Sequence, residues 1–168
     1  MMRYAAYAIV VAALLIVQMT WLARLTVGGA APNPLQVLVM SVGLLHGSEE
    51  GALVGAGVGL LQDVVGGGPL GLGMLAELCV GFAAGLGERV IYMENIWLPI
   101  LAAVALSALH TAVWAAAAHL VGMLQAPILE VARVGALGAC YNGVVAVPIF
   151  RGLRYVDMAL VRDHEDFR

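Results

Sequence analysis

Residues 33–73 read NPLQVLVMSVGLLHGSEEGALVGAGVGLLQDVVGGGPLGLG, and the rest of the chain is organised around them. They contain two uncharged apolar segments, Leu35–Leu45 and Gly51–Leu61, separated by the polar turn His46–Glu50. A run of glycines followed by a proline occupies residues 66–69. This pattern is typical of short apolar helices joined by tight turns.

The whole chain is too apolar for a soluble domain. Of its 168 residues, 62% are hydrophobic and 11% are charged, and the mean hydropathy is +0.97. Soluble domains average about 25% charged residues, so this chain has too little polar surface to cover itself in water. The composition predicts an all-α integral membrane protein, with the lipid bilayer as its surroundings. The net charge of −3 argues against nucleic acid as a partner.

The two apolar segments are predicted to form separate helices. One continuous helix over residues 35–65 would be about 46 Å long at a rise of 1.5 Å per residue, well beyond the ~30 Å hydrocarbon core of a bilayer. We therefore expect one helix over Leu35–His46 and another over Glu49–Val65. Ser48 is the expected N-cap of the second helix, because its side-chain oxygen can accept a hydrogen bond from the first helical turn.

Glycines recur at intervals of four residues in this part of the chain. Gly51, Gly55 and Gly59 form a doubled GxxxG ridge, and Gly81 and Gly85 form another GxxxG pair. Such ridges let two helix backbones approach closely in lipid, where no hydrophobic force drives helices together. We expect all five glycines to mediate helix packing.

The remaining apolar segments complete a prediction of six transmembrane helices. The other four are expected over Tyr4–Thr26, Leu70–Gly87, Ile96–Leu124 and Ile128–Phe150, with Pro69 tolerated in the first turn of the second of these. Residues 1–152 would then form one transmembrane domain, and residues 153–168 a short charged tail in the cytoplasm.

Six spans place both chain termini on the same side of the membrane. Arg151 and Arg154 then lie on that side, and Arg24 and Arg133 lie near the other. By the positive-inside rule, both termini are predicted to be cytoplasmic.

Polar side chains inside the predicted spans are candidates for function, because ionisable groups at membrane depth are costly. The set is Asp63, Glu77, His110, Arg133 and Asn142. A carboxylate is unfavourable at the C-terminal end of a helix, where Asp63 lies, so we expect it to pair with Arg133 or Arg24. Two interpretations of the charged groups stay open: they hold helices together, which is favoured, or they bind a ligand.

His110 falls near the middle of the predicted fifth helix, on one polar face with Ser107, Thr111 and Trp114. A hydrogen bond from His110 to a side chain on another helix is the favoured interpretation, with Asn142 as a candidate partner. The alternative is a proton relay, for which Glu77 is the one titratable group expected at a similar depth.

The sequence lacks the patterns typical of enzymes and metal sites. It contains no lysine and no HExxH, GxSxG or DxxxD pattern, and the glycines at 66–68 lack the Gly-Lys-Ser/Thr continuation of a phosphate loop. Cys79 and Cys140 have no metal-ligand spacing and are expected to be packing residues, with a disulfide as the lesser alternative. We therefore expect no catalytic residue, no cofactor and no metal.

Several motifs resemble the family of the rod shape-determining protein MreD. They are Asn33-Pro34-Leu35, the run GxxxGxxxGLLxD over Gly51–Asp63, and Gly-Gly-Pro-Leu-Gly at residues 67–71. The segment Val147–Arg154, VPIFRGLR, is also similar to the end of that family. The family motif positions in this chain are Pro34, Gly59, Leu60, Asp63, Pro69, Leu70 and Gly71. The Glu49-Glu50 turn and the absence of lysine have no match in the family pattern.

The resemblance implies a function and a fold. The function would be that of a non-catalytic inner-membrane scaffold in the bacterial cell-elongation complex, which binds MreC and supports peptidoglycan synthesis and cell shape. RodA, a class B penicillin-binding protein and MreB would belong to the wider complex. The fold would be that of the six-helix substrate-binding subunits of vitamin-uptake transporters.

Two hypotheses follow for how such a chain works. In the first, the glycine ridge and the turn at residues 63–71 pack the second to fourth helices into a rigid block that presents a surface to a partner's single transmembrane helix. In the alternative, the chain is the substrate-capture subunit of a small-molecule transporter of the vitamin type. The alternative predicts a closed polar cavity near Glu77 and His110.

Overall fold

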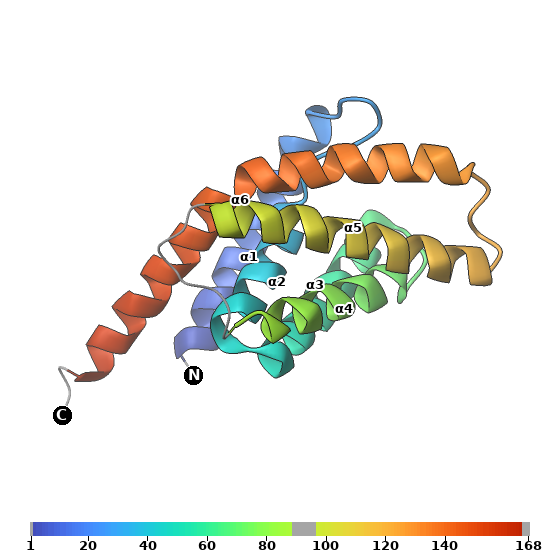
Figure 1. The fold of residues 1–168 in the computed structure, drawn as a ribbon. Helices are drawn as coiled ribbons and strands as arrows, with labels where there is room; N and C mark the ends of the chain where they lie inside the picture. The colour runs from blue at the N-terminus through green and yellow to red at the C-terminus, as the bar shows by residue number, and fades with distance from the viewer. Residues whose placement is uncertain (1, 89–96, 166–168) are drawn as a thin grey trace.

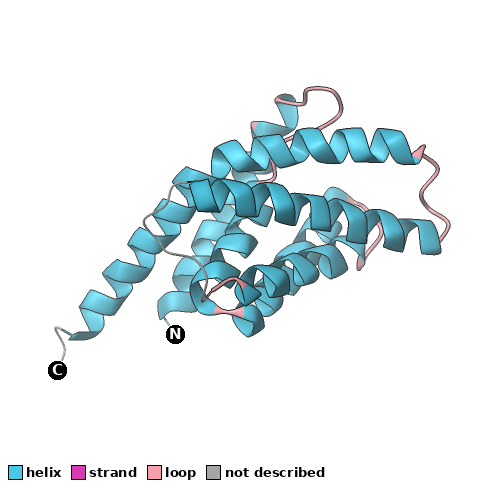
Figure 2. Cartoon of the chain, in the orientation of Figure 1, coloured by secondary structure: helices cyan, strands magenta, loops and turns pink. Residues whose placement is uncertain are grey.

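The computed structural model describes residues 2–88 and 97–165, and throughout these residues the regular structure is helical (Figures 1 and 2). The elements are α1 (Met2–Thr20), the short 3-10 helix η1 (Leu22–Arg24), α2 (Pro34–His46), α3 (Ser48–Gly66), α4 (Leu72–Leu86), α5 (Trp97–Leu120) and α6 (Ile128–Glu165). The predicted all-α class is confirmed, and six α-helices lie in the described part of the chain.

The second helix lies at the centre of the molecule. Every residue from Pro34 to Leu44 is buried, and α2 contacts each of the other α-helices. A helix that is apolar on all sides is typical of such a central position, because none of its faces needs to meet water. Burial also explains why α2 is only 13 residues long: the surrounding helices, rather than lipid, cover its ends.

A single residue separates α2 from α3. Gly47 has φ +90°, a backbone conformation that favours glycine, and it is the N-cap of α3 without a side-chain hydrogen bond. The prediction that Ser48 is the N-cap is therefore wrong, and Ser48 is the first helical residue. The positive φ at position 47 favours glycine, which has no side chain that could cap the helix. By contrast, Asn33 caps α2, since its Oδ1 accepts a hydrogen bond from the Gln36 N–H at 3.0 Å.

The turn between α3 and α4 also depends on glycines. Gly67 (φ +65°) ends α3, and Gly71 (φ +100°) directly precedes α4. The fourth helix therefore begins at Leu72 rather than at Leu70 as predicted, and Pro69 lies in the turn instead of in the first helical turn. A residue in the left-handed region cannot be part of a right-handed helix, so Gly71 sets this boundary.

The last helix is much longer than predicted. α6 continues through Pro148 to Glu165 and is 38 residues long, so the predicted end at Phe150 is wrong. It bends where its orange part passes into its red part (Figure 1), as expected at a proline, which removes one backbone hydrogen bond and kinks a helix without ending it. Buried side chains lie on both sides of Pro148, among them Ala146 and Leu153. The division into residues 1–152 and 153–168 stays a prediction.

Two other predicted helix ends are also too late. α1 stops at Thr20 and is followed by η1, whereas the prediction extended to Thr26. α5 stops at Leu120 rather than Leu124, because the chain turns at Gly122, which has φ +71°. The predicted start of this helix at Ile96 lies outside the described residues.

The C-terminal part of α6 returns to the first two helices. The Tyr7 hydroxyl donates a hydrogen bond of 2.6 Å to Asp157 Oδ1, and His46 Nε2 lies 3.1 Å from Asp157 Oδ2. These contacts join α1, α2 and α6. In Figure 1 the ends marked N and C accordingly emerge at the same end of the molecule.

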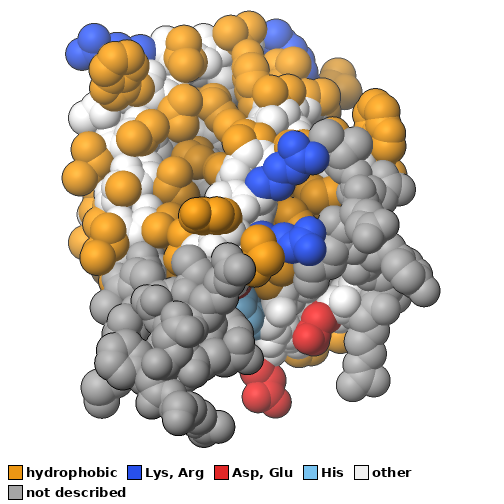
Figure 3. All heavy atoms as spheres, turned by 90° about the vertical axis from the view of Figure 1, so that its left-hand side faces the viewer, with side chains coloured by type: hydrophobic (Ala, Val, Ile, Leu, Met, Phe, Trp, Pro, Cys, Tyr) orange, Lys and Arg blue, Asp and Glu red, His pale blue; other side chains and the backbone are white. Residues whose placement is uncertain are grey.

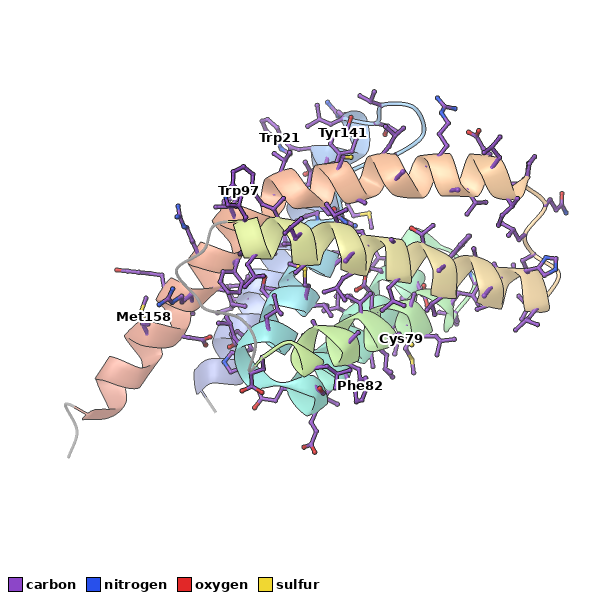
Figure 4. The ribbon with its side chains drawn as sticks, in the orientation of Figure 1. Trp21, Cys79, Phe82, Trp97, Tyr141 and Met158 are labelled. Atoms are coloured by element: carbon purple, nitrogen blue, oxygen red, sulfur yellow. The ribbon has the colours of Figure 1, made fainter. Side chains whose placement is uncertain are left out.

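The surface of the molecule is largely apolar. Hydrophobic side chains cover most of the described surface visible in Figure 3. In Figure 4, Trp21, Phe82, Trp97 and Met158 point away from the bundle, and each is about half exposed or more. By length and composition, two helical stretches could each cross a membrane, Trp97–Leu120 and Ile128–Met158, and three shorter apolar helices accompany them.

Candidate functional site

The predicted glycine ridge lies in the interface between α3 and α4. Gly51, Gly55 and Gly59 face the backbone carbonyl groups of Gly81, Glu77 and Gly73, one pair per helical turn. A Cβ atom on any of the three α3 glycines would overlap the α4 backbone. The two backbones are therefore in direct contact, with no side chains between them.

The second GxxxG pair belongs to the same interface. A Cβ atom on Gly81 would overlap the backbone of Gly51, and one on Gly85 would overlap the backbone around Ser48. The structure thus brings all five predicted glycines together. Gly43 of α2, which has the same four-residue spacing but was not predicted to mediate packing, lies against the backbone of Gly81, so three helices meet at glycines here. The sequence feature that indicates this role for Gly43 is the four-residue glycine spacing, which continues upstream of Gly51.

Asp63 holds the start of the next helix. Its carboxylate oxygens accept hydrogen bonds from the backbone N–H groups of Gly71 (2.8 Å), Gly73 (3.1 Å) and Met74 (3.2 Å). The first N–H groups of a helix have no partner within the helix and favour a negative charge. Because α3 and α4 are antiparallel, the C-terminal end of α3 delivers the carboxylate to this position.

The predicted ion pair of Asp63 with Arg133 or Arg24 is wrong. Arg133 instead lies 3.4 Å from Glu130, one turn earlier on α6, and both side chains are exposed. Arg24 is exposed at the end of η1. The prediction considered only cations as partners and overlooked the N–H groups of the following helix.

The family motif positions gather around the α3–α4 turn. Gly59 and Asp63 lie on α3, and Pro69, Leu70 and Gly71 form the turn that Asp63 bonds. The other two positions are Leu60, which is exposed on α3, and Pro34, which is the first residue of α2.

Asn142 is the centre of a buried hydrogen-bond network. Its Oδ1 accepts from the Asn33 backbone N–H at 2.8 Å, and its Nδ2 donates to Gln36 Oε1 at 2.8 Å and to Ser107 Oγ at 2.9 Å. Gln62 of α3 adds a hydrogen bond of 3.0 Å to Asn33 Oδ1. The network therefore ties α2, α3, α5 and α6 together.

His110 contacts another helix, as the favoured interpretation expects, but the suggested partner Asn142 is wrong. Its Nε2 lies 3.4 Å from Oε1 of Glu77, the alternative partner. Glu77 is completely buried, and within the described residues neither of its carboxylate oxygens has a hydrogen bond. The His110 imidazole is thus the ionisable group that lies next to the Glu77 carboxyl group. Asn142 was unavailable, because Gln36 and Ser107 already occupy its amide.

A cavity of about 450 Å³ lies beside this network, between α2, α5, α6 and the loop before α2. Its polar lining consists of Asn33, Gln36, Ser107, His110, Thr111 and Asn142, with Glu130 also contributing. Most of the other lining residues are small or apolar, and Trp114 supplies an aromatic wall. The closed polar cavity predicted near Glu77 and His110 is therefore not found: the observed cavity is open and mostly apolar, and it includes His110 but not Glu77.

Gln36 was overlooked in the sequence. It is 5% exposed, and its Nε2 has no hydrogen-bond partner among the described residues. The sequence feature that could have indicated a buried polar contact is this single amide side chain in the otherwise apolar first turns of α2. In the same part of the chain, no group of three or more His, Cys, Asp or Glu residues could hold a metal ion, and Cys79 and Cys140 are free thiols.

Comparison with known proteins identifies one family. A family model described as rod shape-determining protein MreD matches residues 2–155. No curated protein matches the chain. No solved structure matches it either. The family match extends from α1 into the part of α6 beyond Pro148, and so includes the glycine interface, the Asp63 contacts and the cavity.

Proposed function

Because the chain belongs to the MreD family, whose members are rod shape-determining proteins, we propose that it is a non-catalytic membrane scaffold that binds MreC. The family implies a role in determining rod shape. The proposal adds the partner and the setting: the bacterial cell-elongation complex, with RodA, a class B penicillin-binding protein and MreB, in support of peptidoglycan synthesis. The observation that carries it is the family match over residues 2–155.

The packing of α2, α3 and α4 suits a scaffold. The glycine interface between α3 and α4, which we call the α3–α4 seam, brings the two backbones into contact. Together with the three hydrogen bonds to Asp63, it leaves these helices little freedom to move relative to one another. A rigid block costs little conformational entropy when it binds a partner, because it is already ordered. The same block contains most of the family motif positions.

An apolar stripe on the outer side of α4 is the surface we assign to MreC. It consists of Leu75, Cys79, Phe82 and Leu86, which recur at helical spacing. Phe82 and Leu86 are well exposed, and Figure 4 shows Cys79 and Phe82 pointing away from the bundle on the same side of α4. A partner's transmembrane helix could pack on this stripe by van der Waals contact.

The proposed setting is the inner membrane, with six spans and both termini in the cytoplasm. Two observations support it: both chain ends emerge at one end of the molecule (Figure 1), and large exposed apolar side chains occur on α1, α3, α4, α5 and α6. The expected likeness to the substrate-binding subunits of vitamin-uptake transporters belongs to the same proposal. Reporter fusions that fluoresce only in the cytoplasm, placed at each terminus and in the Gly28–Ala31 loop, test this topology: both termini should fluoresce and the loop should not.

Co-purification tests the assignment to MreC. Phe82→Ala combined with Leu86→Ala should reduce recovery of MreC several-fold, because it removes the largest side chains of the stripe. The matched control, Leu101→Ala with Val104→Ala, truncates exposed apolar side chains on α5 and should leave recovery unchanged. Equal recovery with both pairs would reject the α4 stripe, and failure of the wild-type chain to retain MreC would reject the partner.

A further inference from the structure

We propose that Glu77 and His110 together bind one exchangeable proton in the interior of the bundle, and that His110 connects this proton to the open cavity between α2, α5 and α6. The site goes beyond the scaffold function, because binding MreC requires no proton at this position. It is supported by the burial of Glu77, by the fixed position of α4 and by the contacts of His110.

The Glu77 carboxyl group is enclosed by protein. Glu77 is 0% exposed, and in the part of the chain that the structure describes neither of its carboxylate oxygens accepts a hydrogen bond. An ionised carboxylate in such surroundings is very unfavourable unless a positive charge compensates it. The carboxyl group must therefore carry a proton itself or lie beside a protonated neighbour.

The α4 helix has little freedom to carry this group elsewhere. The backbone carbonyl of Glu77 belongs to the α3–α4 seam, where a Cβ on Gly55 would overlap it. The Glu77 side chain points the other way, to α5. The start of α4 is held as well, because Asp63 accepts hydrogen bonds from its backbone N–H groups. The carboxyl group thus stays buried in either charge state.

His110 is the neighbour that shares a proton with Glu77. Its Nε2 lies 3.4 Å from Glu77 Oε1, and its side chain is 22% exposed, whereas that of Glu77 is fully buried. His110 also lines the open cavity, and Glu77 does not. The imidazole therefore contacts both the carboxyl group and the cavity, and its two nitrogens can each bind a proton. A proton from the cavity can reach Glu77 through this side chain.

No permanent positive charge on the surrounding helices compensates Glu77. The helices α2, α3, α4 and α5 contain no arginine, and the chain contains no lysine. Asp63 of α3 acts on His110 electrostatically and adds negative charge. Glu130 of α6 lines the same cavity, but exposed Arg133 lies 3.4 Å from it. The other titratable side chains on α2 to α5 are His46, Glu49, Glu50, Cys79 and His119.

Binding the proton changes the charge of the pair by one unit. An ionised Glu77 beside a neutral His110 has a net charge of −1. One added proton makes the pair neutral overall, whether it resides on the carboxyl group or on the imidazole, and no other bond forms or breaks. Unfolded Glu and His side chains have pKa values of about 4.3 and 6.5, so the unfolded chain releases this proton near neutral pH. The folded chain keeps it.

NMR of the full chain in detergent detects this proton. The Glu side-chain carboxyl carbons are labelled with 13C and the imidazole nitrogens with 15N, because both chemical shifts report protonation. At about pH 7.5 exposed Glu side chains are ionised and exposed His side chains are mostly neutral. We expect one Glu carboxyl group or one imidazole to remain protonated at this pH, to exchange its proton with D2O while the chain stays folded, and to lose the signal in Glu77→Gln.

The stability of the protein should also depend on pH through this pair. Above about pH 7 the folded chain holds one proton more than the unfolded chain, so the unfolding equilibrium constant should rise with pH, toward about tenfold per pH unit. Glu77→Gln, which has a neutral side chain of the same shape, should lack this rise. Glu49→Gln is the matched control: it removes an exposed carboxyl group of α3 and should keep the rise. Unfolding by SDS in mixed micelles, from about pH 7 to about pH 9, measures the difference.

The outcomes are distinct. The proposal is supported if the wild-type chain shows the protonated group and if Glu77→Gln, but not Glu49→Gln, removes the pH dependence. It is overturned if every Glu carboxyl group is ionised and every imidazole is neutral at about pH 7.5, if the signal does not exchange with D2O, or if the wild type and Glu77→Gln have the same pH dependence. The wild-type spectrum decides the matter even where Glu77→Gln does not fold. Recovery of MreC is a separate measurement, so either proposal can fail without the other.

Discussion

The α3–α4 and α5–α6 pairs are both antiparallel helices of one chain, yet they pack in opposite ways. α3 and α4 meet backbone to backbone through glycines that alternate across the seam. α5 and α6 meet through side chains, and with α2 they line an open cavity of about 450 Å³. The comparison shows that glycines on one helix alone do not bring two backbones into contact: both helices of the α3–α4 pair contribute them.

The glycines of α6 illustrate this point. A Cβ on Gly135 would collide with the Thr111 side chain, one on Gly143 would meet Val104 and Ile100 at ordinary contact distances, and one on Gly138 would meet nothing. α5 contains no glycine to face them. The α5–α6 pair therefore depends on side-chain contacts and on the Asn142 network, and it leaves room that the α3–α4 pair does not have.

The largest expected effect comes from breaking the α3–α4 seam. Gly55→Leu would place a side chain into the backbone of Glu77 and should prevent folding or destabilise the protein by more than the ~1–3 kcal/mol typical of overpacking. Gly57→Leu, on the open side of the same helix, should behave like the wild type. Fluorescence-detected size-exclusion chromatography and thermal unfolding in detergent measure the difference. Undiminished stability and MreC recovery in a well-expressed Gly55→Leu variant would contradict the importance of the ridge.

A smaller effect is expected from removing the hydrogen bonds that hold α5 and α6 to α2. Asn142→Leu leaves Gln36 Oε1 and the Asn33 N–H without their partner, at about 1–3 kcal/mol for a buried group left unsatisfied. The free energy of unfolding should fall accordingly, while hydrogen exchange in α3 and α4 stays slow. Equal acceleration of exchange in both pairs would show that they are not independent.

The next effect concerns the end of the glycine seam. Asp63→Ala removes the acceptor of three N–H groups at the start of α4 and should lower the unfolding free energy by about 0.5–2 kcal/mol. Asp63→Asn keeps one acceptor oxygen and should lose less. Unfolding midpoints of the two variants decide this point. If they are equal, the negative charge of Asp63 accounts for its role better than the accepting oxygens do.

The smallest effect should come from Tyr7→Phe, which leaves both helix pairs intact. It removes the hydroxyl that donates to Asp157 and should cost about 1 kcal/mol or less, because the pair is partly exposed. Hydrogen exchange should rise in the C-terminal part of α6 and nowhere else. Faster exchange around the cavity as well would mean that the end of α6 supports the α5–α6 pair.

The elements that could be predicted from the sequence are those governed by neighbouring residues. The break at Gly47 and the glycine ridge follow from local spacing and from the limits on helix length in a bilayer. The contacts of His110 and Asp63 could not be predicted, since they depend on the rotation and depth of helices that are not adjacent in sequence. The length of α6 could not be predicted for a related reason: buried side chains beyond Phe150, such as Leu153, belong to the same helix, and a single sequence does not reveal their burial.

The position of α6 has a consequence for how the chain is made. α2, α3 and α4 are close in sequence, so their seam can form soon after these helices leave the ribosome. Asn142 and Asp157, in contrast, belong to α6, which is synthesised after α2 to α5. We therefore expect a nascent chain that has not yet reached Asn142 to hold a finished glycine-packed hairpin beside an open α2–α5 face. Until α6 arrives, that face is where a membrane chaperone or a quality-control protease would recognise an incomplete molecule.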